Sequence, residues 1–151
     1  MPELPEVETI RLGLEPYVVG SRILDVAVHH PRAVRRHVAG AAAFRDQLIG
    51  QGVQAAVRRG KYLWLLLEGS RALVIHLGMS GQLLVHHGEP PPHRHLRVSL
   101  RLTDDRSVSF VDQRTFGHLL VTGLVPTSDG GPGGLGSDRS LIPEVVAHIA
   151  R

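Results

Sequence analysis

A chain of 151 residues is long enough for one domain with a buried core, and a composition of 42% hydrophobic and 21% charged residues is typical of a globular protein. The absence of cysteine excludes disulfides and any cysteine-ligated zinc site within this sequence. A net charge of +3 is too small to argue by itself for a nucleic-acid partner. The longest apolar run, 63–67, is far too short to cross a membrane, and the acidic N-terminus is unlike a signal peptide, so we expect a cytoplasmic protein.

The first fifty residues predict two helices with a strand and a basic loop between them. Apolar residues recur at helical spacing over residues 5–18, which indicates an amphipathic helix that stops before Gly20. Its apolar face would consist of Val7, Ile10, Leu14 and Val18. The following segments should form a strand over 23–28, a basic loop over 32–40 and a short helix over 41–49.

The middle of the chain predicts short strands separated by turns at hairpin spacing. The expected strands cover residues 53–58, 62–68, 72–77, 83–86, 96–102, 108–111 and 118–122. Together with the strand over 23–28 they favour a mainly β fold with flanking helices. About eight such strands would form a two-sheet β-sandwich or a flattened barrel, with the N-terminal helix carrying the chain terminus.

The composition changes near residue 125. Residues 1–125 read as a single domain, and residues 126–139 are glycine-rich and typical of a flexible linker. Residues 140–151 show an apolar stripe at helical spacing, made of Ile142, Val145, Val146 and Ile149. We therefore expect 140–151 to begin a helical domain whose remainder is absent from this sequence.

The N-terminus could carry covalent chemistry. Removal of Met1 would leave Pro2 with a free secondary amine, and an α-amine titrates near ~8, well below a lysine at ~10.4. More of it is therefore neutral at pH 7 and able to form a Schiff base with a carbonyl carbon. Glu3 is adjacent and could act as an acid or base. The alternative is that Pro2 and Pro5 only begin the helix, where a missing N–H costs nothing.

Two internal segments place chemically useful side chains in turns. Lys61 follows Gly60 at the start of a strand, where it could hold a phosphate or transfer a proton; alternatively it belongs to a solvated basic turn. Met79 lies in a glycine-flanked loop, from which a flexible apolar side chain could fill the gap left by a flipped base. The alternative for Met79 is a place in the core.

A third segment joins a cation to an aromatic side chain. Arg114 could bind a phosphate or the orphaned base, and Phe116 could wedge between base pairs. A surface arginine beside a core phenylalanine is the alternative. His93 and His95 form an H-x-H pair, a pattern that can bind metal. No cysteine and no obvious carboxylate accompanies the pair, so we predict no metal site.

Four motifs in chain order, spread over residues 2–125, give the sequence a family resemblance. They are PELPEVE at the N-terminus, RRGKYL with Lys61, HLGMSG with Met79, and DQRTFG with Arg114 and Phe116. Together the chain resembles bacterial formamidopyrimidine-DNA glycosylases, and endonuclease VIII enzymes less, because these usually have glycine at the position of Leu4. The family commonly has Asp-Pro-Arg-Arg-Phe-Gly where this chain has Gln113 and Thr115, which puts one backbone contact in question.

The resemblance implies a bifunctional DNA glycosylase and abasic-site lyase of base excision repair. It would remove oxidised purines such as 8-oxoguanine and formamidopyrimidines and cut the strand by β,δ-elimination. Pro2 would attack C1′ of the damaged nucleotide, Glu3 would move protons on the sugar, and Lys61 would be the catalytic lysine. DNA-binding roles would fall on His95, Arg114, Met79 and Phe116, with His93 as a second, weaker candidate beside His95.

The resemblance also implies partners and missing parts. The partner would be double-stranded DNA with oxidised purines or abasic sites, bound by a monomer near the bacterial nucleoid. Family members continue into a helical domain and a C-terminal zinc finger with four cysteines, so we expect no cofactor in this chain and an impaired, truncated enzyme. Two alternatives stay open: a non-catalytic DNA-binding remnant, and an N-terminal-proline tautomerase, which the many strands fit poorly.

Overall fold

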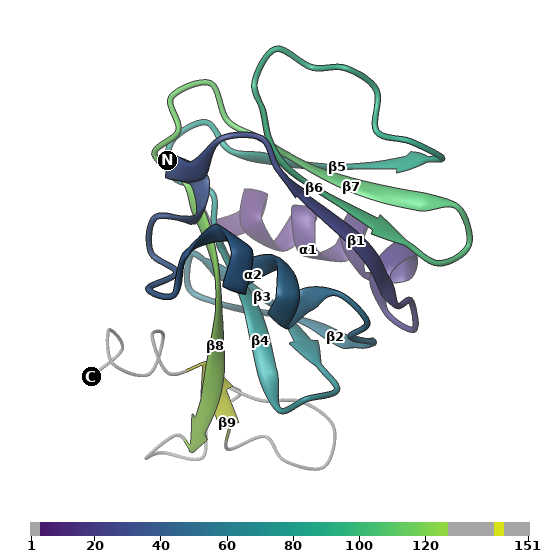
Figure 1. The fold of residues 1–151 in the computed structure, drawn as a ribbon. Coiled ribbons are helices and arrows are strands. Elements are labelled where there is room, and N and C mark those ends of the chain that lie inside the picture. The colour runs from purple at the N-terminus through teal and green to yellow at the C-terminus, as the bar shows by residue number, and fades with distance from the viewer. Residues whose placement is uncertain (1–3, 127–140, 144–151) are drawn as a thin grey trace.

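Two antiparallel sheets face each other in the computed structural model, which describes residues 4–126 and 141–143 (Figure 1). The four-stranded sheet has the order β1 (Ile23–Val28), β6 (Leu96–Leu102), β7 (Arg106–Val111) and β5 (Gln82–His87). The five-stranded sheet has the order β2 (Val53–Arg59), β3 (Tyr62–Leu67), β4 (Arg71–His76), β8 (His118–Pro126) and β9 (Leu141–Pro143). The predicted two-sheet β-sandwich is therefore confirmed.

The core lies between the two sheets and follows from the alternation of the strands. In β3, Leu63, Leu65 and Leu67 are buried in the main core, whereas Trp64 belongs to a second apolar cluster on the other face of its sheet. Successive side chains of a strand point to opposite faces, so one strand supplies both clusters. The apposed sheet contributes Val98, Leu100, Leu102, Val108 and Phe110 to the main core.

Two helices close the open sides of the sandwich. Helix α1 (Leu4–Val18) contacts β2 and β5, the edge strands of the two sheets on one side. Helix α2 (Gly40–Leu48) contacts β1 and β8 on the other side. The apolar face predicted for α1 is confirmed, because its members pack into the main core: Val7, Leu14 and Val18 are buried and Ile10 is partly buried. No helix in the described part of the chain is long and apolar enough to span a membrane.

Two segments differ from the sequence prediction. The expected basic loop begins with a short 3-10 helix, η1 (Pro31–Val34), in which proline occupies the first turn. The helix expected over 140–151 does not begin as predicted, because Leu141–Pro143 form strand β9, paired with the end of β8. Pro143 disfavours the helical conformation at the residue before it, and β8 continues to Pro126, which offers a free edge. Residues 127–140 and 144–151, including most of the predicted linker, lie outside the described residues.

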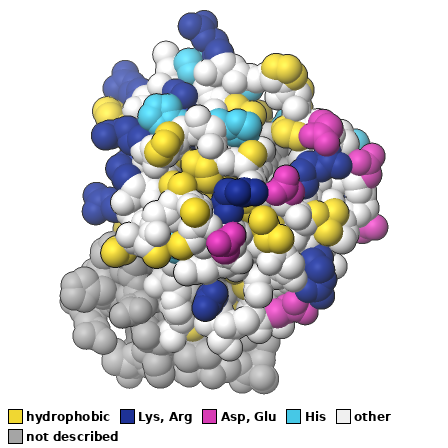
Figure 2. All heavy atoms as spheres, viewed as in Figure 1, with side chains coloured by type: hydrophobic (Ala, Val, Ile, Leu, Met, Phe, Trp, Pro, Cys, Tyr) yellow, Lys and Arg dark blue, Asp and Glu magenta, His cyan; other side chains and the backbone are white. Residues whose placement is uncertain are grey.

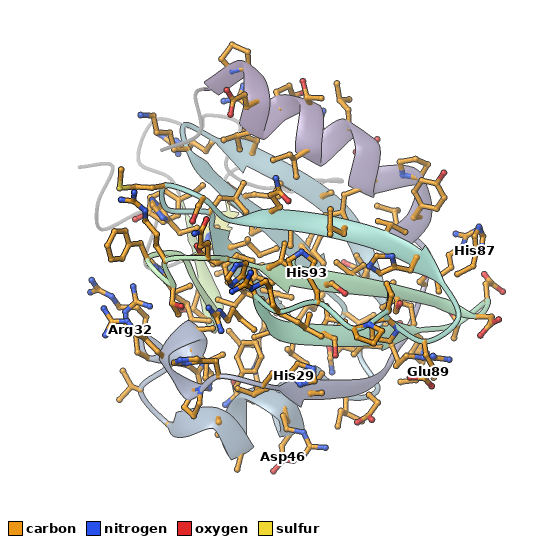
Figure 3. The ribbon with its side chains drawn as sticks, turned by 90° about the horizontal axis from the view of Figure 1, so that it is seen from above. His29, Arg32, Asp46, His87, Glu89 and His93 are labelled. Carbon is orange, nitrogen blue, oxygen red and sulfur yellow. The ribbon has the colours of Figure 1, made fainter. Side chains whose placement is uncertain are left out.

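One long connection returns the chain along the four-stranded sheet. Strands β5 and β6 both run antiparallel to β7, so they are parallel to each other and need a crossover. The crossover, residues 88–95, contains three consecutive prolines, which favour an extended chain of about 3.1 Å per residue. Figure 3 shows this segment running back from Glu89 to His93 along the sheet. It brings His95 to the end of the sandwich at which β6 starts.

Candidate nucleic-acid interface

The strand registers gather several loops at one end of the sandwich. In the four-stranded sheet, Val111 at the end of β7 pairs with Gln82 at the start of β5 and with Leu96 at the start of β6. In the five-stranded sheet, Tyr62 pairs with His76, which pairs with His118. Two short loops, residues 77–81 and 112–117, connect the sheets here (Figure 1). We call this the loop end of the molecule.

Every predicted site residue that the structure describes lies in a segment at the loop end. Lys61 is in the turn between β2 and β3, Met79 follows β4, and His95 precedes β6. Arg114 and Phe116 lie between β7 and β8. The side chains of Met79 and Phe116 are 54% and 47% exposed, which contradicts the alternative that either belongs to the core. Topology therefore brings together residues that are up to 55 positions apart in the sequence.

The first turn of α1 also lies at the loop end. Arg58, at the end of β2, donates from Nε to Glu8 Oε1 at 3.0 Å. At the other end of α1, Arg106 at the start of β7 donates to the carbonyl oxygen of Tyr17 at 3.2 Å. The helix thus runs along the sandwich, with its start beside the β2–β3 turn. Pro2 and Glu3 lie outside the described residues, and α1 begins at Leu4.

Glu8 is a structural anion of this region. Its hydrogen bonds from Arg11, and next from Arg58, lower the pKa of the carboxyl group to about 2 against the opposing effect of partial burial. Arg11 also donates to the carbonyl oxygen of Ala56 in β2 at 3.1 Å. Glu8 therefore stays ionised at neutral pH and fixes the start of α1 against β2, a function that its position in PELPEVE does not reveal.

The two connecting loops pack backbone against backbone. Gly78 has a φ of +61°, and a Cβ there would lie 2.6 Å from the backbone nitrogen of Gly117. Only glycine permits both this conformation and this approach. The close contact places the segments that carry Met79 and Phe116 side by side.

Asp112 organises the loop that presents Arg114 and Phe116. Asp112 is 1% exposed, and the Ser80 hydroxyl donates a hydrogen bond to its Oδ1 at 2.6 Å. The backbone N–H groups of Arg114 and Gly117 donate to the same carboxylate at 3.2 and 2.8 Å. The aspartate of the DQRTFG motif is thus a loop anchor. Sequence reasoning quoted this residue without assigning it a role.

Thr115 marks the departure from the family motif. It is 5% exposed and has a φ of +56°, the left-handed region that β-branched residues rarely adopt. The residue at this position is therefore turned into the protein and does not offer a long cation to a phosphate. The family resemblance put one contact with the DNA backbone in question at this loop, and that doubt about the contact stays a prediction.

A row of ring side chains crosses β3, β4 and β8 at the loop end. The rings of Tyr62 and His76 meet edge to face at 5.1 Å between centroids, and those of His76 and His118 stack at 5.3 Å. Burial, then the neighbouring His76, Arg35 and Arg36, lowers the pKa of His118 to about 4.

The same environment keeps His76 neutral. Burial, followed by the charge of Lys61, lowers the pKa of His76. Its Nδ1 accepts a hydrogen bond from the Gly78 N–H at 3.1 Å, which leaves the proton of the neutral ring on Nε2. The sequence alone did not indicate His76 or His118. They are far apart in the chain and become neighbours only because β4 pairs with β8.

Positive charge is concentrated at the loop end. Figure 2 shows Lys and Arg side chains gathered on the left of the molecule, where Figure 1 places these loops, and acidic side chains mainly on the right. Figure 3 places Arg32 at the outer margin of this region. The basic residues of the segments at this end are Arg32, Arg35, Arg36, Arg58, Arg59, Lys61, Arg94, Arg97 and Arg114. Such an arrangement suits nucleic-acid binding, because the cations can bind phosphates and the exposed apolar side chains can contact the bases.

Within residues 4–126 and 141–143, no group of three or more histidine, aspartate or glutamate side chains could hold a metal ion. His93 and His95 lie 5.8 Å apart between ring centroids, as a pair. The sequence contains no cysteine, so no thiolate could join this pair.

Comparison with known proteins agrees with this geometry. The sequence model of the formamidopyrimidine-DNA glycosylase N-terminal domain matches residues 1–119, most of the chain and all the motifs. The chain belongs to the formamidopyrimidine-DNA glycosylase family. Formamidopyrimidine-DNA glycosylase of Rhodococcus jostii is 53% identical over 152 residues, and that of Thermobifida fusca is 54% identical over 159 residues. Each alignment covers this whole chain but only 49% and 51% of the relative, so the chain spans about half the length of these glycosylases.

Solved structures of the glycosylase family share the fold. Lactococcus lactis formamidopyrimidine-DNA glycosylase, bound non-covalently to DNA with an abasic site, has a TM-score of 0.73 and 32% identity. The match covers 80% of this chain and 45% of that one. The same enzyme in complex with DNA that contains N7-benzyl-Fapy-dG gives the same TM-score and identity over 80% and 43% of the two chains.

Proposed function

We propose that this chain carries the catalytic half of a base-excision DNA glycosylase with abasic-site lyase activity on oxidised purines. The observation that carries the proposal is the convergence of Lys61, Met79, His95, Arg114 and Phe116 at one basic end of the sandwich. The start of α1 lies at the same end, and Pro2 precedes it by one intervening residue. Lactococcus lactis relatives of the same fold bind DNA with abasic and Fapy-dG sites, which supports this substrate class.

The proposed reaction begins with the N-terminal amine. The neutral nitrogen of Pro2 attacks C1′, and the bond to the damaged base breaks with its electron pair leaving on the base. The departing base takes up a proton, and the nitrogen of Pro2 loses its own N–H proton. The sugar then opens as Glu3 donates a proton to the ring oxygen, which leaves an iminium ion between Pro2 and C1′.

Strand cleavage would follow from the same iminium ion. Loss of a C2′ proton expels the 3′ phosphate by β-elimination, and a second elimination expels the 5′ phosphate. The positive iminium nitrogen accepts the electron pair in each step, so no oxidant or reductant is required. Lys61 would hold the phosphate or transfer a proton during these eliminations, as its place in the turn beside α1 allows.

Recognition would use the remaining residues of the loop end. His95 and Arg114 would bind the DNA backbone together with Lys61, and Met79, Arg114 and Phe116 would fill the space left by the flipped nucleotide. Partial desolvation, then the charges of Arg94 and Arg97, lowers the pKa of His95 in the free chain. Double-stranded damaged DNA as partner, a monomeric state and a cytoplasmic, nucleoid-associated location complete the proposal.

A DNA-binding remnant without catalysis is the second candidate, because a basic surface with exposed apolar side chains suits DNA binding whether or not chemistry follows. The tautomerase alternative is weakened by the fold, since every strand pair described here is antiparallel and no β-α-β unit is present in residues 4–126. Both rivals make a clear prediction: neither forms a covalent adduct with DNA.

Borohydride trapping on abasic DNA tests the proposed function. Borohydride reduces the iminium ion to a stable amine, so the catalytic chain should become covalently attached to the DNA. Intact mass should show loss of Met1, and acetylation of the N-terminus should abolish trapping because an amide nitrogen is not nucleophilic. Undiminished trapping by the acetylated chain would refute Pro2 as nucleophile, and DNA binding without any trapping would favour the remnant.

A further inference from the structure

Arg35 binds the backbone of the loop that carries Arg114 and Phe116. It follows η1, and its Nη1 donates to the carbonyl oxygens of Thr115 at 3.3 Å and Gly117 at 3.1 Å. Its Nη2 donates to the carbonyl oxygen of Phe116 at 2.9 Å. One guanidinium group therefore binds three consecutive carbonyl oxygens about 80 positions away in the sequence.

This loop needs such support because its backbone is unfavourable. The left-handed conformation of Thr115 is unfavourable for a β-branched residue and persists only where the surroundings hold it. Asp112 satisfies N–H groups of the loop, at Arg114 and Gly117. Arg35 satisfies carbonyl groups of the same loop, so the two charged side chains hold complementary halves of one turn.

We propose that Arg35 is a positioning residue for lesion recognition: it holds residues 115–117 in the conformation that presents Phe116 to DNA. The proposal rests on the proposed function, since it assigns the loop to base-gap filling. Arg35 Nη1 also donates to the Arg32 carbonyl oxygen at 2.8 Å, so most of its contacts are directed into the protein. From the sequence alone, Arg35 belonged only to the predicted basic loop over 32–40.

The competing role is a direct phosphate contact, because Arg32 and Arg36 are neighbours on the same basic surface. The two roles differ in their salt dependence. Loss of one phosphate contact lowers the slope of log affinity against log salt by about 1. Loss of a positioning residue leaves this slope unchanged. Instead, the Phe116 side chain no longer inserts between the base pairs.

The experiment compares Arg35→Gln with Arg36→Gln in the full chain, since both substitutions remove one positive charge from the same face. The DNA is a duplex with a tetrahydrofuran abasic analogue and a neighbouring 2-aminopurine, whose fluorescence rises when a wedge unstacks it. At saturating protein and low salt, Arg35→Gln should lose most of this rise, as Phe116→Ala should. Arg36→Gln should retain it. The salt slope of Arg35→Gln should equal that of the wild type.

A full fluorescence rise with Arg35→Gln would overturn the proposal, and so would a salt slope lowered by about 1 with the rise preserved. If Arg35→Gln fails to fold, Arg35→Lys takes its place, because a lysine keeps the charge but its single ammonium cannot bridge three carbonyl groups. A clear loss of the rise with an unchanged slope then supports the positioning role, whereas a full rise overturns it.

A measurement without DNA separates this inference from the proposed function. Hydrogen exchange at the amides of Arg114 and Gly117 should be faster in free Arg35→Gln than in free Arg36→Gln, because the loop opens more often. Equal exchange at both amides would refute the positioning role. A wild-type chain that neither binds nor traps abasic DNA would refute the proposed function, while the exchange rates would still decide whether Arg35 holds the loop.

Discussion

At the scale of single residues, the buried carboxylate of Asp112 determines the shape of the recognition loop. Asp112→Ala leaves the hydroxyl of Ser80 and the amides of Arg114 and Gly117 without their acceptor. We expect a loss of about 2–3 kcal/mol in the free energy of unfolding, because unsatisfied buried donors keep their desolvation cost. Urea unfolding measures this loss.

The matched control for Asp112 is Asp46→Ala. Asp46 is exposed on α2, away from the loop end (Figure 3), and its loss should change stability by no more than about 0.5 kcal/mol. Asp112→Asn should fall between the two, since an amide keeps one acceptor oxygen. Equal stability of the Asp112→Ala and Asp46→Ala proteins would show that the carboxylate does not anchor the loop.

His118 should make stability fall in weak acid. Its pKa is about 4 in the folded chain and near 6.5 unfolded, so the unfolded chain binds the proton first as the pH falls. Stability due to the neutral ring is complete above about pH 6.5 and is lost progressively towards pH 4. His76, whose pKa is also lowered, adds to the effect. Burial is the largest cause for both rings, and Arg35 and Arg36 add unfavourable charge.

The variant that checks this pH dependence is His118→Phe, which keeps a ring against His76 and removes the titration. Between pH 7 and about 4.5, its free energy of unfolding should fall less than that of the wild type. The difference between the two falls should be at most about 3 kcal/mol. This range lies above most of the titration expected for Glu8, whose folded pKa is about 2. His87→Phe, at an exposed position of β5 far from the loop end, should keep the wild-type pH dependence. A His118→Phe profile parallel to the wild type would contradict the assignment.

At the scale of elements, the close approach of the loops 77–81 and 112–117 is the decisive contact. Gly78→Ala combines a strained φ with a Cβ 2.6 Å from Gly117 N, so the loops must separate. Gly60→Ala has nearly the same φ, +60°, but meets nothing within 4 Å. The control should cost about 1–2 kcal/mol of stability from strain alone.

Gly78→Ala should therefore cost clearly more stability than Gly60→Ala and should also reduce the 2-aminopurine signal, because Met79 and Phe116 move apart. Thermal unfolding and the same labelled duplex measure the two effects. Equal costs for both substitutions would mean that the loops yield without loss and that their contact does not position the wedge.

At the scale of the whole molecule, the 151 residues span about half of their glycosylase relatives. Tested alone, these 151 residues supply only their own phosphate contacts, and such contacts dominate DNA affinity. We expect lyase activity on abasic DNA that is strongest at low salt, with little excision of 8-oxoguanine from duplex. Single-turnover rates on both substrates at about 20 and 150 mM salt, across the screening range, test this. Full-rate excision at the higher salt would show that this half suffices.

The contributions of Lys61 and Arg114 to DNA affinity can be measured one at a time. Lys61→Ala and Arg114→Ala should each lower the salt slope by about 1, because each removes one phosphate contact. An unchanged slope in either variant would show that this side chain does not bind the backbone.

The sequence by itself determined most of the elements and the candidate residues. Periodicity gave the buried face of α1 and the alternation of β6, because a helix or strand that buries one face must repeat at its own period. Local motifs selected Lys61, Met79, Arg114 and Phe116, since glycine-flanked turns expose side chains. The false helix at 141–143 arose because an apolar spacing outweighed Pro143, and the free edge of β8 became visible only in the fold.

Only the tertiary structure decided how these residues act together. Strand register placed His118 against His76 and created a neutral pair that no local pattern contains. The partners of Arg35 lie about 80 positions away, and the burial of Asp112 depends on both loops. Hydrogen bonds, desolvation and charge act over a few ångströms of space, whereas a sequence pattern records only neighbours along the chain. The chemistry of the loop end is therefore encoded in the sequence but can be read only after the chain has folded.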